Sequence, residues 1–188
     1  MRKALRCFVC GLKELGEHLL LLKQFGCPSC GAAETLNCHS KLYGNDPDST
    51  AGGPIQRGQR VWCCPRGQRG GCGKSFSIFL AQVLPRHTVR ASALWSLLER
   101  LLEGASVKAA VEALGLGFGL ETLYHLRQRM RPRLAAVRPM LCREGKAPAA
   151  SSQTDPLLET VEHLRRLFPQ SGCPCADFQL HFQRPLLE

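Results

Sequence analysis

The sequence predicts an α+β fold that is mostly α, in which a small cysteine-rich module of short strands precedes a helical bundle and a C-terminal helix. Three observations predict it. Residues 27–80 are rich in Gly, Pro, Cys and polar residues and hold only short apolar runs. From residue 86 onwards, apolar side chains recur at the spacing of amphipathic helices. Residues 145–154, GKAPAASSQT, have the composition of a linker between folded segments.

The first part of the chain is expected to contain one helix and three short strands. Residues 12–25 predict a helix inside an N-terminal helical segment, 1–26. Strands are expected near residues 34–38, 59–64 and 75–80. The cysteine-rich module around these strands has too few apolar residues for a core of its own, so we expect a bound metal to hold it together.

The second part of the chain, residues 86–144, is expected to be helical. A first helix is predicted from Thr88, a candidate N-cap, to Gly104. A short second helix is predicted between Ser106, which can cap it, and Gly115, which can end it. This pair of helices leads into the segment with the highest density of arginine.

Two more helices are expected further along the chain. The third covers residues 120–131 and is predicted to close at Pro132, because proline lacks the backbone N–H that a helix needs. After the linker, Asp155 is expected to cap a helix that begins with Pro156. This helix and the tail after it make up the expected C-terminal segment, 155–188.

The charge of the chain favours a nucleic-acid partner. Lys and Arg exceed Asp and Glu by 25 to 15, which gives a formal net charge of +10. Residues 81–145 hold ten basic and five acidic side chains, so the middle of the chain is its most electropositive part. A basic balance of this size is typical of proteins that bind polyanions. The alternative is a basic surface that is simply solvated.

The cysteines point to metal rather than to disulfide bonds. There are eleven, and an odd number argues against a simple disulfide framework. No export signal or membrane span is expected, since Arg6 interrupts the first apolar residues and the LLLL run lies beyond Glu14 and Glu17. We therefore expect a cytoplasmic, nucleoid-associated protein with no membrane partner and no small-molecule substrate. In a reducing compartment, clustered cysteines usually bind metal.

Two short motifs have the spacing of metal ligands. Cys27 and Cys30 lie three positions apart, and Gly31 can adopt the positive φ that such a turn favours. The Cys-Gly pair recurs at Cys72 and Gly73, which makes Cys72 the second ligand of a second pair. Two such pairs separated by about thirty residues are typical of a zinc ribbon with Zn²⁺ as its cofactor.

The first ligand of the second pair is either Cys63 or Cys64. In a strand these two side chains point to opposite faces, so both cannot reach one ion. If Cys64 is the ligand, Trp62 would shield the metal and the loop to Cys72 would be shorter. Pro65 holds Cys64 extended, which suits a tight ligand turn less well and favours Cys63. The expected set is Cys27, Cys30, Cys63 and Cys72, with Cys64 as a partly exposed bystander.

Other cysteines and two arginines near the site have weaker assignments. Cys38 and His39 could supply a spare ligand, and a second site could form from Cys7, Cys10, Cys173 and Cys175 only if the two termini meet. Arg66 and Arg69 lie in the loop of the second pair. They can offset the negative charge of four metal-bound thiolates and contact DNA phosphates, or they can be ordinary solvated loop residues.

The second and third helices have the proportions of a helix-turn-helix. In the third, Leu120, Leu123, Leu126 and Met130 share an apolar face. The opposite face carries side chains that can hydrogen-bond base edges in a major groove: Thr122, His125, Gln128 and Arg129. Arg131 and Arg133 follow as expected phosphate contacts. The alternative is the polar face of an ordinary three-helix bundle.

These motifs together resemble a known family. The order CPSCG…RVWCC…GGCGKSFS, then LPRHTVRA, then the helical pair is similar to the N-terminal part of insertion-sequence transposases, including short transposase-like zinc-ribbon proteins of bacteria. The resemblance covers roughly residues 27–139. It implies binding to double-stranded DNA at the ends of a mobile element, with a transposase subunit as a further partner. It also favours Cys63, since in the family an aromatic residue directly precedes the ligand cysteine.

The chain departs from complete transposases after this region. In the family, a ribonuclease-H-like domain supplies three acidic metal ligands. Only 49 residues follow position 139, which is too few for that fold. We therefore expect a non-catalytic DNA-binding protein and no enzyme. The alternative is a protein-interaction adaptor whose zinc ribbon docks on a transposase subunit or a polymerase.

Overall fold

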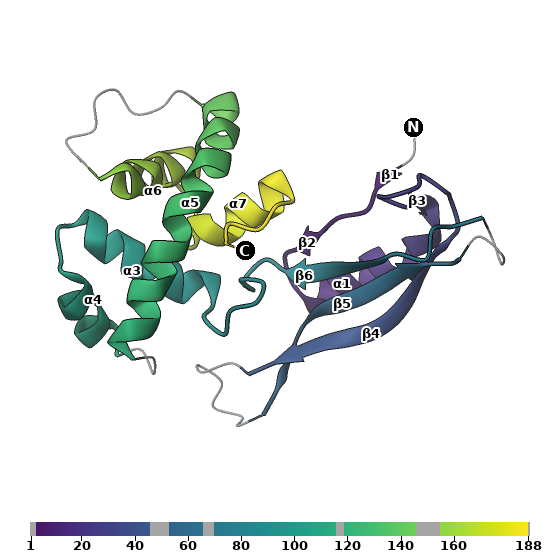
Figure 1. The fold of residues 1–188 in the computed structure, drawn as a ribbon, viewed down its shortest axis with the longest axis horizontal. Coiled ribbons are helices and arrows are strands. Elements are labelled where there is room, and N and C mark those ends of the chain that lie inside the picture. The colour runs from purple at the N-terminus through teal and green to yellow at the C-terminus, as the bar shows by residue number, and fades with distance from the viewer. Residues whose placement is uncertain (1–2, 46–52, 66–69, 116–118, 146–154, 188) are drawn as a thin grey trace. The chain divides into compact units, whose positions relative to one another are not determined.

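The computed structural model describes residues 3–45, 53–65, 70–115, 119–145 and 155–187. The chain divides into two compact units, Met1–Val83 and Leu84–Glu188, and each is described by itself. The first unit contains a four-stranded sheet and the second is helical (Figure 1). The prediction of a chain that mixes α and β structure is therefore confirmed at this level.

The sheet of the first unit is built on an antiparallel meander. Its strands lie in the order β2 (Phe8–Val9), β6 (Ser75–Leu80), β5 (Ile55–Cys63) and β4 (Leu36–Gly44). β4, β5 and β6 pair antiparallel, and the short β2 adds parallel to β6. All three expected strands are present, but β4 and β5 are each nine residues long. Their extensions are mostly polar, because much of this part of the sheet is exposed, and so they carry little hydrophobic signal.

The N-terminal residues fold onto this sheet. The helix expected over 12–25 is shorter: α1 covers Leu12–Leu20, and a 3₁₀ turn, η1, covers Leu22–Gln24. Two further strands, β1 (Lys3–Ala4) and β3 (Phe25–Gly26), pair in parallel. α1 lies against one face of the sheet (Figure 1) and contacts β5 and β6.

One hydrophobic core joins the N-terminal segment to the strands. Leu15 of α1 and Phe25 of β3 belong to the same buried cluster as Val61 and Ile78 of the sheet. Cys63, also in this cluster, is fully buried. The predicted N-terminal segment, 1–26, therefore belongs to the same compact unit as the sheet.

The second unit contains five helices among its described residues: α3 (Ala91–Leu102), α4 (Val107–Leu114), α5 (Leu120–Glu144), α6 (Pro156–Leu167) and α7 (Pro174–Phe182). α3 packs on α4, α6 and α7, while α5 packs on α4 and α6. The expected cap at Ser106 is confirmed, because its hydroxyl accepts a hydrogen bond from the Ala109 amide at 3.2 Å. Gly115 ends α4 with a φ of 55°, as expected.

The start of α3 differs from the prediction. The helix begins at Ala91, and Arg90 rather than Thr88 occupies the N-cap position without a side-chain cap. Val89 is buried at 1 % exposure, so the segment before α3 is anchored by apolar packing. Thr88 is exposed and lies outside the helix.

The predicted end of the third helix is also wrong. α5 continues through Pro132 and Pro139 and is 25 residues long. A proline inside a helix costs about 3 kcal/mol, because it removes a hydrogen bond and crowds the preceding turn. The turns beyond Pro132 bury Val137 and Leu141 in contact with α6, and burying such side chains contributes about 2 kcal/mol each. This burial offsets much of the cost of the two prolines, and a prediction from the proline alone leaves it out.

The C-terminal part begins as predicted and then adds a helix. Asp155 caps α6, and Pro156 is its first residue. α7 lies where only a tail was expected, although Pro174 at its start is a typical first helical residue. Residues 146–154 of the predicted linker lie outside the described residues. No helix in the part of the chain that the structure describes is long and apolar enough to cross a membrane.

Candidate metal centre and polar helix face

Four cysteine sulfurs meet in the first unit. Those of Cys27, Cys30, Cys63 and Cys72 all lie within 4.8 Å of one another. The Cys27–Cys72 pair is separated by 3.6 Å and the Cys30–Cys63 pair by 3.8 Å. Four thiolates at about 2.3 Å from one tetrahedral ion lie about 3.8 Å apart. The four residues therefore fit a single tetrahedral metal ion.

The ligand candidates come from parts of the chain that are distant in sequence. Cys27 and Cys30 lie in the turn after β3, Cys63 is the last residue of β5, and Cys72 precedes β6. A bound ion would thus cross-link the N-terminal layer to the β5–β6 hairpin. This position explains how a unit with a small apolar core can be held together.

The glycines that follow Cys30 and Cys72 share a left-handed backbone conformation. Gly31 follows Cys30 with a φ of 71°, and Gly73 follows Cys72 with a φ of 73°. Only glycine adopts this left-handed region without strain. The prediction that each Cys-Gly pair marks such a turn is confirmed.

Backbone and hydroxyl groups surround the sulfurs. The Cys72 amide donates to the Cys63 Sγ at 3.2 Å, and the Ser29 amide donates to the Cys27 Sγ at 3.4 Å. The Thr35 Oγ1 lies 3.2 Å from the Cys63 Sγ. Hydrogen bonds of this kind stabilise the thiolate, which is the form that binds metal.

The pKa values of the thiols reflect these contacts. Desolvation raises the pKa of Cys63, but the hydrogen bonds with the Thr35 hydroxyl and from the Cys72 amide outweigh it, so this pKa lies below its ordinary value. The pKa of Cys72 is lowered to about 7, chiefly by a hydrogen bond from the backbone of Lys74. Desolvation raises the pKa of Cys27 to about 12. Metal binding at neutral pH would therefore release protons from the cluster.

Cys64 lies outside the cluster. Its sulfur accepts a hydrogen bond from the Asn37 side-chain amide at 2.9 Å, and its own amide donates to the Thr35 carbonyl at 2.9 Å. Cys64 is only 6 % exposed, so the expectation that it is partly exposed is wrong. The neighbouring strand β4 supplies Asn37, and this long-range contact has no signal in the sequence.

The other sequence candidates are not brought into this cluster. Within the described residues, the four-cysteine group is the one set of metal-binding side chains that lies close enough to hold an ion. Cys38 and His39 are exposed on β4. Cys7 and Cys10 are exposed in the first unit, while Cys173 and Cys175 are buried in the second. Arg66 and Arg69 lie outside the described residues.

The first half of α5 has a buried face and an exposed polar face. Leu123, Leu126 and Met130 are at most 4 % exposed. Leu120, which was expected beside them, is 36 % exposed because it is the first residue of the helix. The predicted base-reading side chains are all exposed: Thr122, His125, Gln128 and Arg129.

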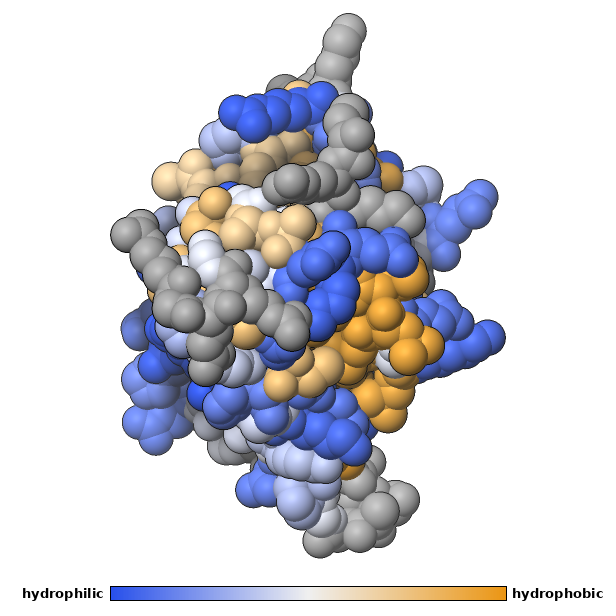
Figure 2. All heavy atoms as spheres, turned by 90° about the vertical axis from the view of Figure 1, so that its right-hand side faces the viewer, coloured by the Kyte–Doolittle hydropathy of each residue, from blue (hydrophilic) through white to orange (hydrophobic). Residues whose placement is uncertain are grey.

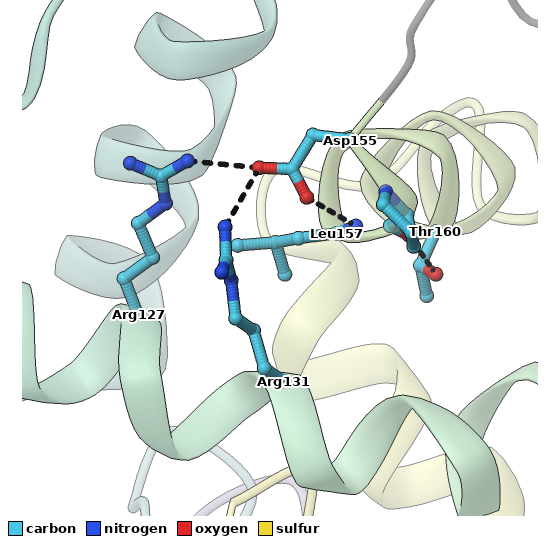
Figure 3. Close-up of polar contacts among 6 residues, drawn as sticks. Arg127, Arg131, Asp155, Leu157 and Thr160 are labelled. Carbon is cyan, nitrogen blue, oxygen red and sulfur yellow. Dashed lines mark hydrogen bonds and ion pairs between the residues drawn. The ribbon is translucent and has the colours of Figure 1, made fainter.

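The expected phosphate contacts Arg131 and Arg133 are engaged within the second unit. Figure 3 shows Arg127 and Arg131 reaching from α5 to the carboxylate of Asp155 at the start of α6, at 2.8 and 3.4 Å. Arg133 donates to the Pro185 carbonyl at 3.2 Å. Both predicted residues thus fasten α5 to C-terminal segments, and the spacing in the sequence does not reveal these partners.

Asp155 combines two stabilising contacts. It accepts a hydrogen bond from the Leu157 amide as the cap of α6, and it pairs with both arginines (Figure 3). Desolvation raises the pKa of Asp155, but the hydrogen bonds from Arg127 and Leu157 and the charge of Arg131 outweigh it. Since the folded pKa lies below the unfolded value of about 3.9, this stability is present above about pH 4 and is lost as the pH falls further.

Two substitutions at Asp155 separate these contacts. Asp155→Asn keeps a capping side chain and should cost about 0.5–1 kcal/mol, since partly exposed ion pairs contribute little. Asp155→Ala also removes the cap and should cost about 1–2 kcal/mol. Urea unfolding followed by circular dichroism measures both. Equal costs for the two variants would contradict the capping role.

No family model, curated protein or solved structure matches this chain. The resemblance to insertion-sequence transposases therefore remains an expectation from the sequence motifs.

Proposed function

We propose that the chain is a zinc-stabilised, non-catalytic protein of transposase type that binds double-stranded DNA. In this proposal, residues 120–131 of α5 enter the major groove, and the basic loop with Arg66 and Arg69 contacts phosphates. The observation that carries it is the first half of α5. Leu123 and Leu126 fix the helix against its unit, while His125 and Gln128 stay exposed on the other side.

The arrangement of α4 and α5 supports this assignment. α4 is eight residues long, ends at the left-handed Gly115 and is followed by α5, whose first residue is Leu120 (Figure 1). A short helix, a turn and a second helix with an exposed polar face are the parts of a helix-turn-helix. Exposed amide, imidazole and hydroxyl groups are the groups that read base edges.

Zinc is the proposed ion in the cysteine cluster. Tetrahedral sites of four thiolates that stabilise small folds typically hold Zn²⁺. In this chain the ion would supply cross-linking rather than chemistry, because the four sulfurs fill its coordination. The cluster therefore serves the DNA-binding proposal as a structural element.

A change at Gln128 tests the reading of DNA. Sequences that bind the purified protein are first selected from random duplexes. Gln128→Ala should then lose about 1–3 kcal/mol of preference at one base pair of the selected site, measured by competition binding. Gln170→Ala is a matched control, since this exposed amide lies between α6 and α7. An unchanged preference in Gln128→Ala would show that α5 is not the reader.

A protein-interaction adaptor is the second candidate, and one observation favours it. The face of the molecule in Figure 2 carries a compact patch of strongly hydrophobic residues bordered by hydrophilic ones. In the first unit, Leu12 and Leu20 of α1 are 55 % and 86 % exposed, and Leu21 is 39 % exposed. Exposed apolar side chains of this kind suit a protein partner. Failure of the protein to bind any duplex at low salt would favour this candidate over DNA binding.

A further inference from the structure

A pocket beside the exposed face of α5 has the chemistry of an anion site. Its volume is about 350 Å³, and it lies between the segment before α3 and the first half of α5. Six lining residues carry polar or charged side chains: Arg86, His87, Thr88, Thr122, His125 and Arg129. Val89 and Leu126 supply its buried apolar wall.

The charged side chains that line the pocket are all basic. Two guanidinium groups, which stay charged at all ordinary pH values, converge on it with two hydroxyls and two imidazoles. None of the described residues that line it is acidic. The carboxylate of Glu121 lies beside one lining residue, with an oxygen 3.7 Å from the His125 Nε2, and both of these side chains are well exposed. A phosphate group matches this set, because arginine forks and hydroxyls donate to its oxygens.

A tight turn carries Arg86 at the edge of the pocket, and the His87 amide closes this turn by donating to the Leu84 carbonyl at 3.1 Å. Arg86 has a φ of 65°, in the left-handed region that favours glycine. The residue is exposed, so its side chain is not held there by burial. Proline followed by a residue of positive φ is typical of a tight turn, and Pro85 precedes Arg86, so the turn accounts for this conformation.

We infer that this pocket binds a backbone phosphate of nucleic acid, through Arg86 and Arg129. The inference rests on the proposed function, since it assigns the phosphate to the same duplex that α5 reads. Gln128 directly precedes Arg129 on α5, so a base in contact with one lies near a phosphate in contact with the other. Arg129, assigned to base reading from the sequence, becomes a phosphate contact, and Arg86, which lies in the LPRHTVRA motif without an assigned role, becomes the second one.

Three variants test the pocket on duplex DNA. Arg86→Gly removes the guanidinium and relieves the left-handed conformation, so its thermal unfolding midpoint should be no lower than that of the parent. Arg129→Ala removes the second guanidinium. Each should reduce the slope of log affinity against log salt by about 0.9, and should weaken selected and unrelated duplexes alike. Arg143→Ala is the control: it is exposed on the same helix, about 21 Å further along, and outside the pocket.

A titration with inorganic phosphate separates the pocket from the DNA proposal. Nuclear magnetic resonance should show saturable shifts of the His87 and His125 ring signals in the parent, and loss of these shifts in Arg86→Gly and Arg129→Ala. Intact duplex binding with unchanged salt slopes in both variants would overturn the pocket and leave the proposed function standing. Phosphate shifts without any duplex binding would overturn the proposed function and the assignment to nucleic acid, and would define a free-phosphate site. Absence of both would overturn both.

Discussion

Cys63→Ser is expected to abolish metal binding and unfold the first unit, whereas Cys64→Ser should retain both metal and fold. A serine hydroxyl keeps its proton at neutral pH and cannot replace a thiolate ligand. The Cys63 sulfur lies 3.8 Å from that of Cys30 within the four-sulfur cluster. The Cys64 sulfur instead accepts a hydrogen bond from Asn37.

The expected size of the effect follows from what a structural ion contributes. Zinc sites of small folds contribute on the order of 10 kcal/mol, which is as much as the whole stability of a typical domain. Loss of one of four ligands should therefore remove most of the stability of the first unit. Cys64→Ser should cost less than about 1 kcal/mol, because a serine oxygen can accept the same hydrogen bond from Asn37.

The two tryptophans allow the units to be followed separately. Trp62 lies in β5 of the first unit, and Trp95 is buried in α3 of the second. In a Trp95→Phe background, fluorescence should report unfolding of the first unit when a chelator removes the metal. The helical signal in circular dichroism should change little. Elemental analysis of protein purified under reducing conditions gives the metal content. Metal loss in Cys64→Ser with normal binding in Cys63→Ser would contradict the assignment.

The sequence predicts the cysteine turns because their signals are local. A Cys-x-x-Cys spacing and a following glycine restrict a few neighbouring residues, and Gly31 has the expected φ. Strand alternation allows only one of Cys63 and Cys64 to be a ligand, and Pro65, which holds Cys64 extended, favours Cys63 together with the family resemblance. Both signals act within one turn or one strand, so a single sequence carries them.

The features that the sequence misses depend on contacts between distant segments. α5 continues past Pro132 because α6 covers the turns that follow. Arg131 turns out to pair with Asp155, 24 positions away, and Cys64 is covered by Asn37 from another strand. Such partners are selected by the packed fold, and no short motif encodes them. For the same reason, Arg131 and Arg133, which were expected to contact phosphates, have partners within the second unit.

Gly71→Ala should disrupt the metal centre, although Gly71 is not a ligand. A Cβ at this position would lie 2.5 Å from the Cys63 Sγ and closer still to the Cys64 carbonyl oxygen. Neither atom can easily move, because Cys63 is fully buried at the end of β5 and the carbonyl belongs to the backbone. The turn that carries Cys72 would have to shift away, and the contact of that sulfur with Cys27 at 3.6 Å would open.

Two other glycine-to-alanine substitutions provide a comparison for the stability cost of Gly71→Ala. Gly73→Ala meets no atom within 4 Å but places alanine at a φ of 73°, which should cost about 1–2 kcal/mol. Gly53→Ala meets open space without a positive φ and should change stability by less than about 1 kcal/mol. Gly71→Ala should lower the free energy of unfolding by more than about 4 kcal/mol, which is the range of mutations that displace buried structure. Urea midpoints and zinc affinity by chelator competition would rank the three variants. A Gly71→Ala protein that binds zinc and unfolds like Gly53→Ala would show that the turn is free to move, and that the close approach of backbone and sulfur does not fix the position of Cys72.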